Sequence, residues 1–208
     1  MTKLKFTKSE DISPDSIEKA FILVVNFTEE AFGAFLKEFV ALERNENVET
    51  IVIYISSYGG YVDCLNPMRD LIKSCTKPVA TVVLGKAMSC GVCLAASGTP
   101  GYRFAAPTCS FMIHEISGGA HGKHADIEIT AEEMKRINKV TMTNLAQDMG
   151  KSYKWLMGKL HDRKNTDWYM DSKGALDLGI IDHIGIPRVN FTKQEKVPQK
   201  TVLIKPEE

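Results

Sequence analysis

The sequence has no excess of charge of either sign: its 208 residues carry 26 basic and 26 acidic side chains, a formal net charge of zero. No basic stripe stands out, so nothing predicts sequence-independent attraction to nucleic acid or to anionic lipid. The chain also lacks an apolar run long enough to span a bilayer, and its first ten residues lack the apolar segment of a signal peptide. We therefore expect a cytoplasmic protein without nucleic-acid or membrane partners.

Cysteine is scarce and odd in number, with five residues in the chain. Without a signal peptide, this count argues for reduced thiols and against a disulfide framework. Cys90 and Cys93 are spaced as a redox or metal pair, but no second pair accompanies them, so packing in an apolar helix is favoured. For His121 and His124 in a glycine-rich segment, a loop flanking the substrate is favoured over a metal site. We predict no metal and no cofactor.

Strand and helix patterns alternate along the chain, which predicts an α/β fold with largely parallel strands. Hydrophobic residues make up 44% of the sequence, enough for one domain with a sizeable core. We place this domain at residues 16–187, between a short N-terminal segment (1–15) and a loosely held polar tail (188–208). Strands are predicted at residues 20–25, 50–55, 79–84, 110–114 and 180–181. Helices are predicted to follow Thr28, to begin at Ser89, and to cover residues 68–73, 130–150, 153–160 and 171–179.

The predicted helix at 130–150 has clear start and stop signals. Thr130 and Glu133 have the spacing of a capping box, and Gly150 suits the position after the last turn. One apolar stripe runs along it, formed by Met134, Ile137, Thr141, Leu145 and Met149. We expect a protruding helix whose stripe packs on a neighbouring subunit.

Three residues form a candidate catalytic set. Ser89 follows a β-branched strand that turns at Gly85, and it begins a helix of small residues, beside free N–H groups and the positive end of the helix dipole. His114 ends an apolar strand and Asp167 begins a short apolar segment. A serine becomes a nucleophile when a neutral imidazole takes its proton and a carboxylate fixes the tautomer of that imidazole.

Each of these residues alone has a more ordinary interpretation. A serine at a helix start is most often a cap, a lone histidine is more often a hydrogen-bonded core residue, and a lone aspartate is a turn or cap residue. Asp162 and Asp171 lie close enough to Asp167 in the sequence to compete for its role. Order and context raise the catalytic interpretation above these.

Four motifs, in this order, resemble those of the Clp-type serine peptidase subunit (ClpP). They are Gly85–Cys90, Phe111–His114, Gly118–Gly119 followed by Ala125–Ile129, and the stretch from Asp167 to Asp182. The resemblance covers about residues 16–187. It implies a ClpP/crotonase-like fold of repeated ββα units with a handle helix within about 118–150, and a serine endopeptidase in which Ser89 attacks, His114 is the base and Asp167 orients it.

The same resemblance implies how substrate and subunits are held. The backbone N–H groups of Gly60 and Cys90 would bind the oxyanion, at a cost of about 100-fold to 1000-fold in turnover if one were lost. An extended polypeptide would pair with the two segments that flank the serine, contacting Tyr61, Val62, Ile116, Ser117 and Gly118. Because this pairing recognises the backbone of the substrate, it predicts loose specificity for the substrate's side chains. The family also implies a homo-oligomer, a heptameric ring that pairs into a double ring and is fed by an AAA+ unfoldase.

The chain departs from the family pattern at three places. The turn usually read as Ser-Pro-Gly-Gly is Ser57–Gly60 with Tyr58 in place of proline, which predicts a less rigid oxyanion loop. Asn165 and Thr166 replace an acidic residue and an arginine that pair across rings, which predicts weaker ring pairing. Val52 replaces one of two aromatic residues expected where the ATPase docks, and this predicts weaker docking. A diverged accessory or phage-encoded copy would fit these losses.

Two other functions stay open at this point. An inactive ring subunit with a scaffold or regulatory role would be favoured by a missing triad member, and none is missing. A crotonase-like acyl-CoA enzyme would need an acid or base, commonly glutamate, near the oxyanion site, and no candidate is as well supported as the triad. If His114 is the base, activity should fall as its imidazole takes up a proton.

Overall fold

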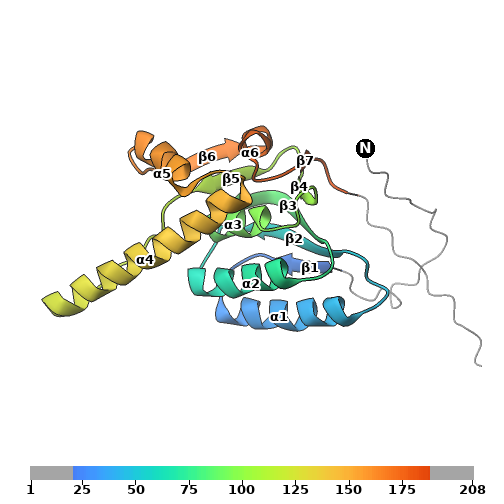
Figure 1. The fold of residues 1–208 in the computed structure, drawn as a ribbon, viewed down its shortest axis with the longest axis horizontal. Coiled ribbons are helices and arrows are strands. Elements are labelled where there is room, and N and C mark those ends of the chain that lie inside the picture. The colour runs from blue at the N-terminus through green and yellow to red at the C-terminus, as the bar shows by residue number, and fades with distance from the viewer. Residues whose placement is uncertain (1–20, 188–208) are drawn as a thin grey trace, which may run out of the picture. The chain divides into compact units, whose positions relative to one another are not determined.

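The computed structural model describes residues 21–187, which belong to one compact unit built on a single sheet (Figure 1). The strands are β1 (Phe21–Val24), β2 (Ile51–Ser57), β3 (Val79–Met88), β4 (Arg103–Ala105), β5 (Ser110–Ile113), β6 (Trp168–Asp171) and β7 (His183–Ile184). The helices are α1 (Glu29–Arg44), α2 (Val62–Ser74), α3 (Cys90–Ala96), α4 (His124–Asp148), α5 (Tyr153–Asp162) and α6 (Ser172–Leu178). The predictions for residues 1–15 and for the tail at 188–208 lie outside the described residues.

The sheet is parallel along the order β1-β2-β3-β4-β7, while β5 pairs in parallel with β3 and β6 runs antiparallel to β5. Strands that follow one another in both sequence and space, joined by right-handed crossovers, place their connecting helices on one face of the sheet. Helices α1, α2 and α3 therefore cover the same face. This confirms the predicted α/β class with a parallel sheet and a long helix.

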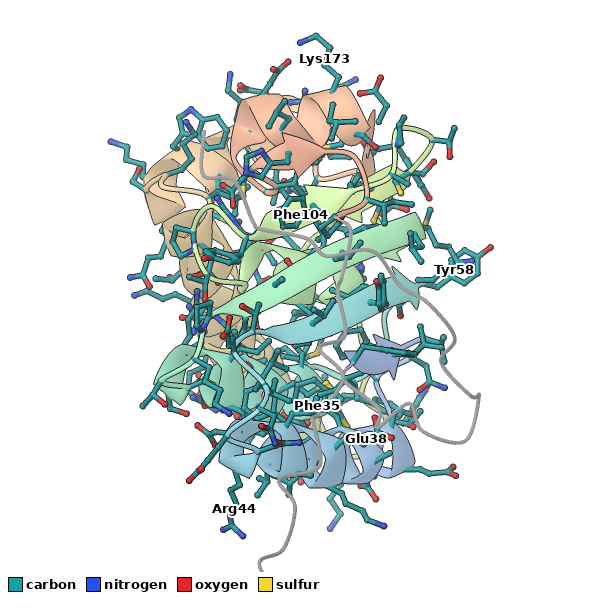
Figure 2. The ribbon with its side chains drawn as sticks, turned by 90° about the vertical axis from the view of Figure 1, so that its right-hand side faces the viewer. Phe35, Glu38, Arg44, Tyr58, Phe104 and Lys173 are labelled. Atoms are coloured by element: carbon teal, nitrogen blue, oxygen red, sulfur yellow. The ribbon has the colours of Figure 1, made fainter. Side chains whose placement is uncertain are left out.

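Helix α1 shows why the local patterns could be read from the sequence. The Thr28 hydroxyl accepts a hydrogen bond from the N–H of Ala31 at 3.2 Å, as a capping residue should. Phe35, Phe39 and Leu42 recur on one side of the helix and are buried. Figure 2 shows Phe35 on the side of α1 that faces the sheet.

Strand β3 bends at Gly85, where φ is +73°, and then continues to Met88. Before the bend, Thr81–Val83 pairs with β4; after it, Lys86–Met88 pairs with β5. The predicted turn at Gly85 is thus a bend within a longer strand. Its consequence is that the residue after β3, Ser89, lies against β5.

Three element predictions were wrong. Helix α2 begins at Val62 rather than near Met68, because Pro67 is accommodated inside the helix instead of marking its start. The strand predicted at 180–181 is buried chain without strand pairing, and the strand follows it as β7. The segment 20–25 was predicted to be buried, but β1 is an edge strand with Leu23 58% exposed.

The start of the long helix was also mispredicted. Helix α4 begins at His124, six residues before Thr130, so Thr130 is not a cap. Its hydroxyl donates instead to the carbonyl of Asp126 at 2.7 Å, a bond typical of threonine inside a helix. The predicted end is confirmed, since Met149 is the C-terminal cap and Gly150 follows with a φ of +69°.

The sequence suggested that the apolar stripe of α4 packs on a neighbouring subunit, but the C-terminal part of this stripe packs on its own chain. The buried residues of α4 belong to its C-terminal half and pack on their own chain: Thr141, Met142, Leu145 and Ala146. The N-terminal half projects beyond the other elements (Figure 1) and carries exposed apolar side chains at Ile127 and Ile129. None of the helices that the structure describes combines the length and hydrophobicity of a membrane span.

Three ion pairs anchor the base of α4. Asp148, at its last position, accepts hydrogen bonds from Arg69 and lies 2.8 Å from the Lys73 ammonium, which ties α4 to α2. Arg103 on β4 pairs with Asp182 and also donates to the carbonyl of Asp148 at 2.7 Å. Charged hydrogen bonds therefore fix the C-terminal end of α4 to α2 and to the sheet.

Replacing Asp182 with asparagine should lower the free energy of unfolding by about 3 kcal/mol at pH 7, because it leaves the buried Arg103 guanidinium without its counter-charge. Burial alone would raise the pKa of the Asp182 carboxyl, but the hydrogen bonds and charge of Arg103 outweigh it and lower that pKa. A lowered pKa stabilises the folded state above the unfolded-state value and loses this effect as the pH falls through the folded-state value.

Urea unfolding at pH 7 and in acid measures the difference in the free energy of unfolding between the parent protein and Asp182→Asn. This difference should shrink as the pH falls. Asp177→Asn is the matched control, since Asp177 pairs with Lys173 at the surface and its loss should change stability by less than about 1 kcal/mol. Equal stability of Asp182→Asn and the parent protein at pH 7 would show that the pair does not anchor α4.

Candidate active site

Ser89 joins β3 to α3 with φ 54° and ψ −120°, a backbone conformation that residues other than glycine rarely adopt. A capping serine has extended backbone and accepts a hydrogen bond from the first turn, whereas Ser89 makes no such bond. The conformation is held because the Ser89 N–H donates to the carbonyl of Met112 at 2.9 Å. Strain of this kind costs on the order of 1–3 kcal/mol and is concentrated at functional sites.

A cavity of about 290 Å³ opens beside Ser89 between α3, β5 and α4. All the site residues predicted from the sequence line it, with the exception of Asp167. The predicted residues that line it are Gly60, Tyr61, Val62, Ser89, Cys90, His114, Ile116, Ser117 and Gly118. The structure thus brings together segments that are far apart in the sequence.

Asp167 is placed by the pairing of β5 with β6. Ile113 lies opposite Trp168 at the end of this antiparallel pair, and the same register continued by one residue would set His114 opposite Asp167. Within residues 21–187, no hydrogen bond joins Ser89 to His114 or His114 to Asp167. The Asp167 carboxylate is exposed and accepts a long hydrogen bond, 3.4 Å, from the Tyr169 hydroxyl.

The competing aspartates have other positions. Asp171 is the N-terminal cap of α6, and its carboxylate accepts a hydrogen bond from the N–H of Gly174 at 2.8 Å. Asp162 is the last residue of α5 and is exposed. Asp167 is therefore the one of the three that the strand register sets beside His114.

The turn at 57–60 is stabilised without a proline. The buried Ser57 hydroxyl accepts a hydrogen bond from the N–H of Gly59 at 3.0 Å. Tyr58 projects from the end of β2 into solvent (Figure 2), and the Lys86 ammonium lies 4.1 Å from the centre of its ring. These two contacts support the turn, but neither fixes the φ of residue 58 as a proline ring would.

Two residues that line the cavity, Gly60 and Cys90, have free backbone donors. The N–H groups of Gly60 and Cys90 have no acceptor in the part of the chain that the structure describes. Gly60 has a φ of +150°, and a Cβ there would lie 2.5 Å from the carbonyl oxygen of Phe27. The Cys90 thiol donates to the carbonyl of Gly60 at 3.1 Å and so links the two segments. Free donors of this kind can stabilise a developing negative oxygen.

The cysteines of α3 act by packing and hydrogen bonding. Burial raises the pKa of the Cys90 thiol to about 11, so it remains protonated at neutral pH and keeps its bond to Gly60. Burial also raises the pKa of the Cys93 thiol. No group of three or more potential metal ligands occurs among residues 21–187, and His124 lies 3.4 Å from Glu128 on the first turns of α4.

The chain after His114 is held by Asn138 of α4, a residue that sequence reasoning missed. Its amide oxygen accepts from the Ile116 N–H at 3.1 Å, and its amide nitrogen donates to the Glu115 carboxylate at 2.5 Å. Polar contacts between segments so far apart in the sequence leave no periodic signal. Helix α4 therefore positions the segment that carries His114.

Backbone groups beside the cavity are only partly available to a bound polypeptide. The Ile116 N–H is bonded to Asn138, and Tyr61 uses its N–H on Phe27 and its carbonyl at the start of α2. Gly60 is engaged as well, because its carbonyl accepts from the Cys90 thiol and its N–H is one of the two free donors described above. Strand addition by an extended chain would therefore use Val62 on one side and Ser117 and Gly118 on the other.

A model of the Clp protease family matches residues 8–188. The match covers the parallel sheet, the strained serine and the projecting helix described above, and it spans most of the chain. The protein belongs to the Clp protease family. Members of this family are usually serine peptidases and typically form oligomeric rings.

Proposed function

We propose that this protein is a serine endopeptidase that cleaves unfolded polypeptides or peptides. The observation that carries the proposal is the backbone of Ser89, strained and without a capping bond, beside a cavity that His114 also lines. Family membership supports it, since the four motifs fall inside the matched region.

In the proposed mechanism, the imidazole of His114 takes the proton of Ser89 as its Oγ attacks the scissile carbonyl. The carbonyl oxygen becomes negative and accepts hydrogen bonds from the free N–H groups of Gly60 and Cys90. His114 then gives the proton to the leaving amine, and an acyl-enzyme remains on Ser89 until water hydrolyses it. Asp167 orients the imidazole and stabilises its cationic form.

The lack of hydrogen bonds among Ser89, His114 and Asp167 is compatible with a catalytic role. Hydrogen bonds among catalytic residues are often long before substrate binds and tighten in the reacting complex. The β5–β6 register supports the pairing of His114 with Asp167, because these residues directly adjoin its last residue pair, Ile113 and Trp168. The Tyr169 hydroxyl would release Asp167 when that pairing forms.

Intact-mass measurement during turnover of a peptide ester tests this proposal. The expected result is a transient mass increase equal to the acyl group, together with new amino termini in a denatured protein substrate. Ser89→Ala should abolish both. A correctly folded and assembled protein that gives neither would contradict the proposal.

The missing contacts between the three catalytic residues also favour a second candidate, a ring subunit without peptidase activity and with a scaffold role. This candidate predicts that the protein forms its oligomer and yet yields no acyl adduct. The crotonase-like alternative is not favoured, because the glutamate nearest the site, Glu115, is bonded to Asn138 rather than lining the cavity.

The proposed assembly is a heptameric ring that can pair into a double ring. Ile127 and Ile129 are exposed on the projecting half of α4, where ring-to-ring contact would cover them. An AAA+ unfoldase is the proposed partner, with docking weakened because Val52, which replaces an expected aromatic residue, is buried.

Ring pairing should be weak because Asn165 and Thr166 offer no charges. Arg163, two residues before Asn165, lies over the ring of Trp168 within its own chain, 4.0 Å from the ring centre. Native mass spectrometry over a dilution series should show double rings giving way to single rings at low micromolar concentration. A double ring that persists on dilution and in high salt would show that other contacts suffice.

A further inference from the structure

The cavity beside Ser89 contains a polar atom that the proposed mechanism does not use. Thr141 lies on the buried half of α4, is 4% exposed and lines the cavity. Its hydroxyl has no hydrogen-bond partner among the described residues. A threonine within a helix commonly bonds the carbonyl four residues earlier, as Thr130 does, but Thr141 does not.

The side chains that line the cavity next to Thr141 along α4 and from α3 are mostly apolar. The lining side chains nearest to Thr141 along α4 are Ile137, Met142 and Leu145, and α3 contributes Val92 and Cys93. The acidic lining residue, Asp63, is exposed in the first turn of α2. A charged group brought deep into this cavity would lose its hydration without finding a counter-charge.

We propose that Thr141 is a specificity-determining residue, which favours a large uncharged side chain with a hydrogen-bonding end, tyrosine or glutamine, on the acyl side of the cleaved bond. The inference rests on the proposed peptidase function. The residue whose carbonyl meets Ser89 places its side chain in the adjoining cavity, and a volume of about 290 Å³ admits an aromatic ring. The apolar walls select against a charged substrate side chain. The unpaired Thr141 hydroxyl favours a substrate side chain with a polar end, because only such an end can form a hydrogen bond with it.

Matched peptide pairs test this directly. Fluorogenic peptides that differ only by phenylalanine or tyrosine, and by methionine or glutamine, at that position give the ratio of kcat/KM for the polar over the apolar member. Thr141→Val keeps the side-chain shape and removes the hydroxyl, and it should lower both ratios about 3-fold to 10-fold. Thr143→Val, on the same helix at a residue that does not line the cavity, should leave both ratios unchanged.

A second pair of variants keeps the test independent of any packing defect. Thr141→Ser retains a hydroxyl and should keep the parent ratios, while Thr141→Ala should lose them as the valine variant does. Active Thr141→Val and Thr141→Ala enzymes with parent ratios would overturn the inference and leave the peptidase proposal intact. Failure of a fluorophosphonate to label the folded, assembled parent protein would overturn the proposed function and this inference with it.

Discussion

Ser89→Ala is expected to lower peptide hydrolysis by at least about 1000-fold while leaving the fold and the oligomer unchanged. The variant removes only the hydroxyl, which accepts no capping bond from α3, so the helix start does not depend on it. His114→Ala should fall to a similar residual rate, and the double variant should be no worse than either single one, because the two residues act as a unit. Steady-state kinetics on a fluorogenic peptide measures the effect.

Ser97→Ala provides a matched control for the serine. Ser97 ends the same helix, is buried, and donates its hydroxyl to the carbonyl of Leu94 at 2.7 Å. Its replacement should cost stability and leave kcat/KM within a few fold of the parent. Substantial hydrolysis by purified Ser89→Ala would remove Ser89 from the mechanism.

Gly59→Ala is expected to lower kcat/KM about 100-fold to 1000-fold, the cost of losing an oxyanion donor. A Cβ at position 59 would lie 2.7 Å from the Cβ of Ser89 and 3.2 Å from the backbone nitrogen of Cys90. The φ of +110° adds backbone strain, and the clash is with parts of the chain that cannot swing aside. The turn must shift away from the serine, and the Gly60 N–H moves with it.

Gly101→Ala separates this effect from backbone strain. Gly101 also has a positive φ, +86°, but a Cβ there would meet nothing within 4 Å, and the residue does not line the cavity. The Gly101→Ala variant should lose about 1–2 kcal/mol of stability and keep the activity of the parent protein. Parent-like kcat/KM in Gly59→Ala would mean that the 57–60 turn does not form the oxyanion site.

Much of the fold could be predicted because its signals are local. The cap at Thr28, the apolar face of α1 and the glycine after α4 each act within a few residues of the chain. The errors came where a second local effect outweighs the expected one. Pro67 is tolerated inside α2, and Thr130 bonds back within α4 instead of capping it.

Some residues of the candidate site could be predicted from the sequence and others could not. Ser89 and His114 could be found because each ends a recognisable element, and the cavity brings them together. Asn138 and Thr141 could not, because their roles depend on what faces α4 after folding: a free backbone N–H in one case, and an apolar cavity in the other. The stripe that contains Thr141 has the same 3.6-residue period whether it faces a subunit or a cavity.

The most direct test of the central claim is to treat the assembled protein with a fluorophosphonate and to locate the adduct by peptide mass spectrometry. The account predicts one adduct, on the peptide that contains Ser89, formed at a rate that falls in acid as the base is protonated and absent in His114→Ala. Labelling that occurs equally in His114→Ala, or an adduct on a different residue, would contradict it.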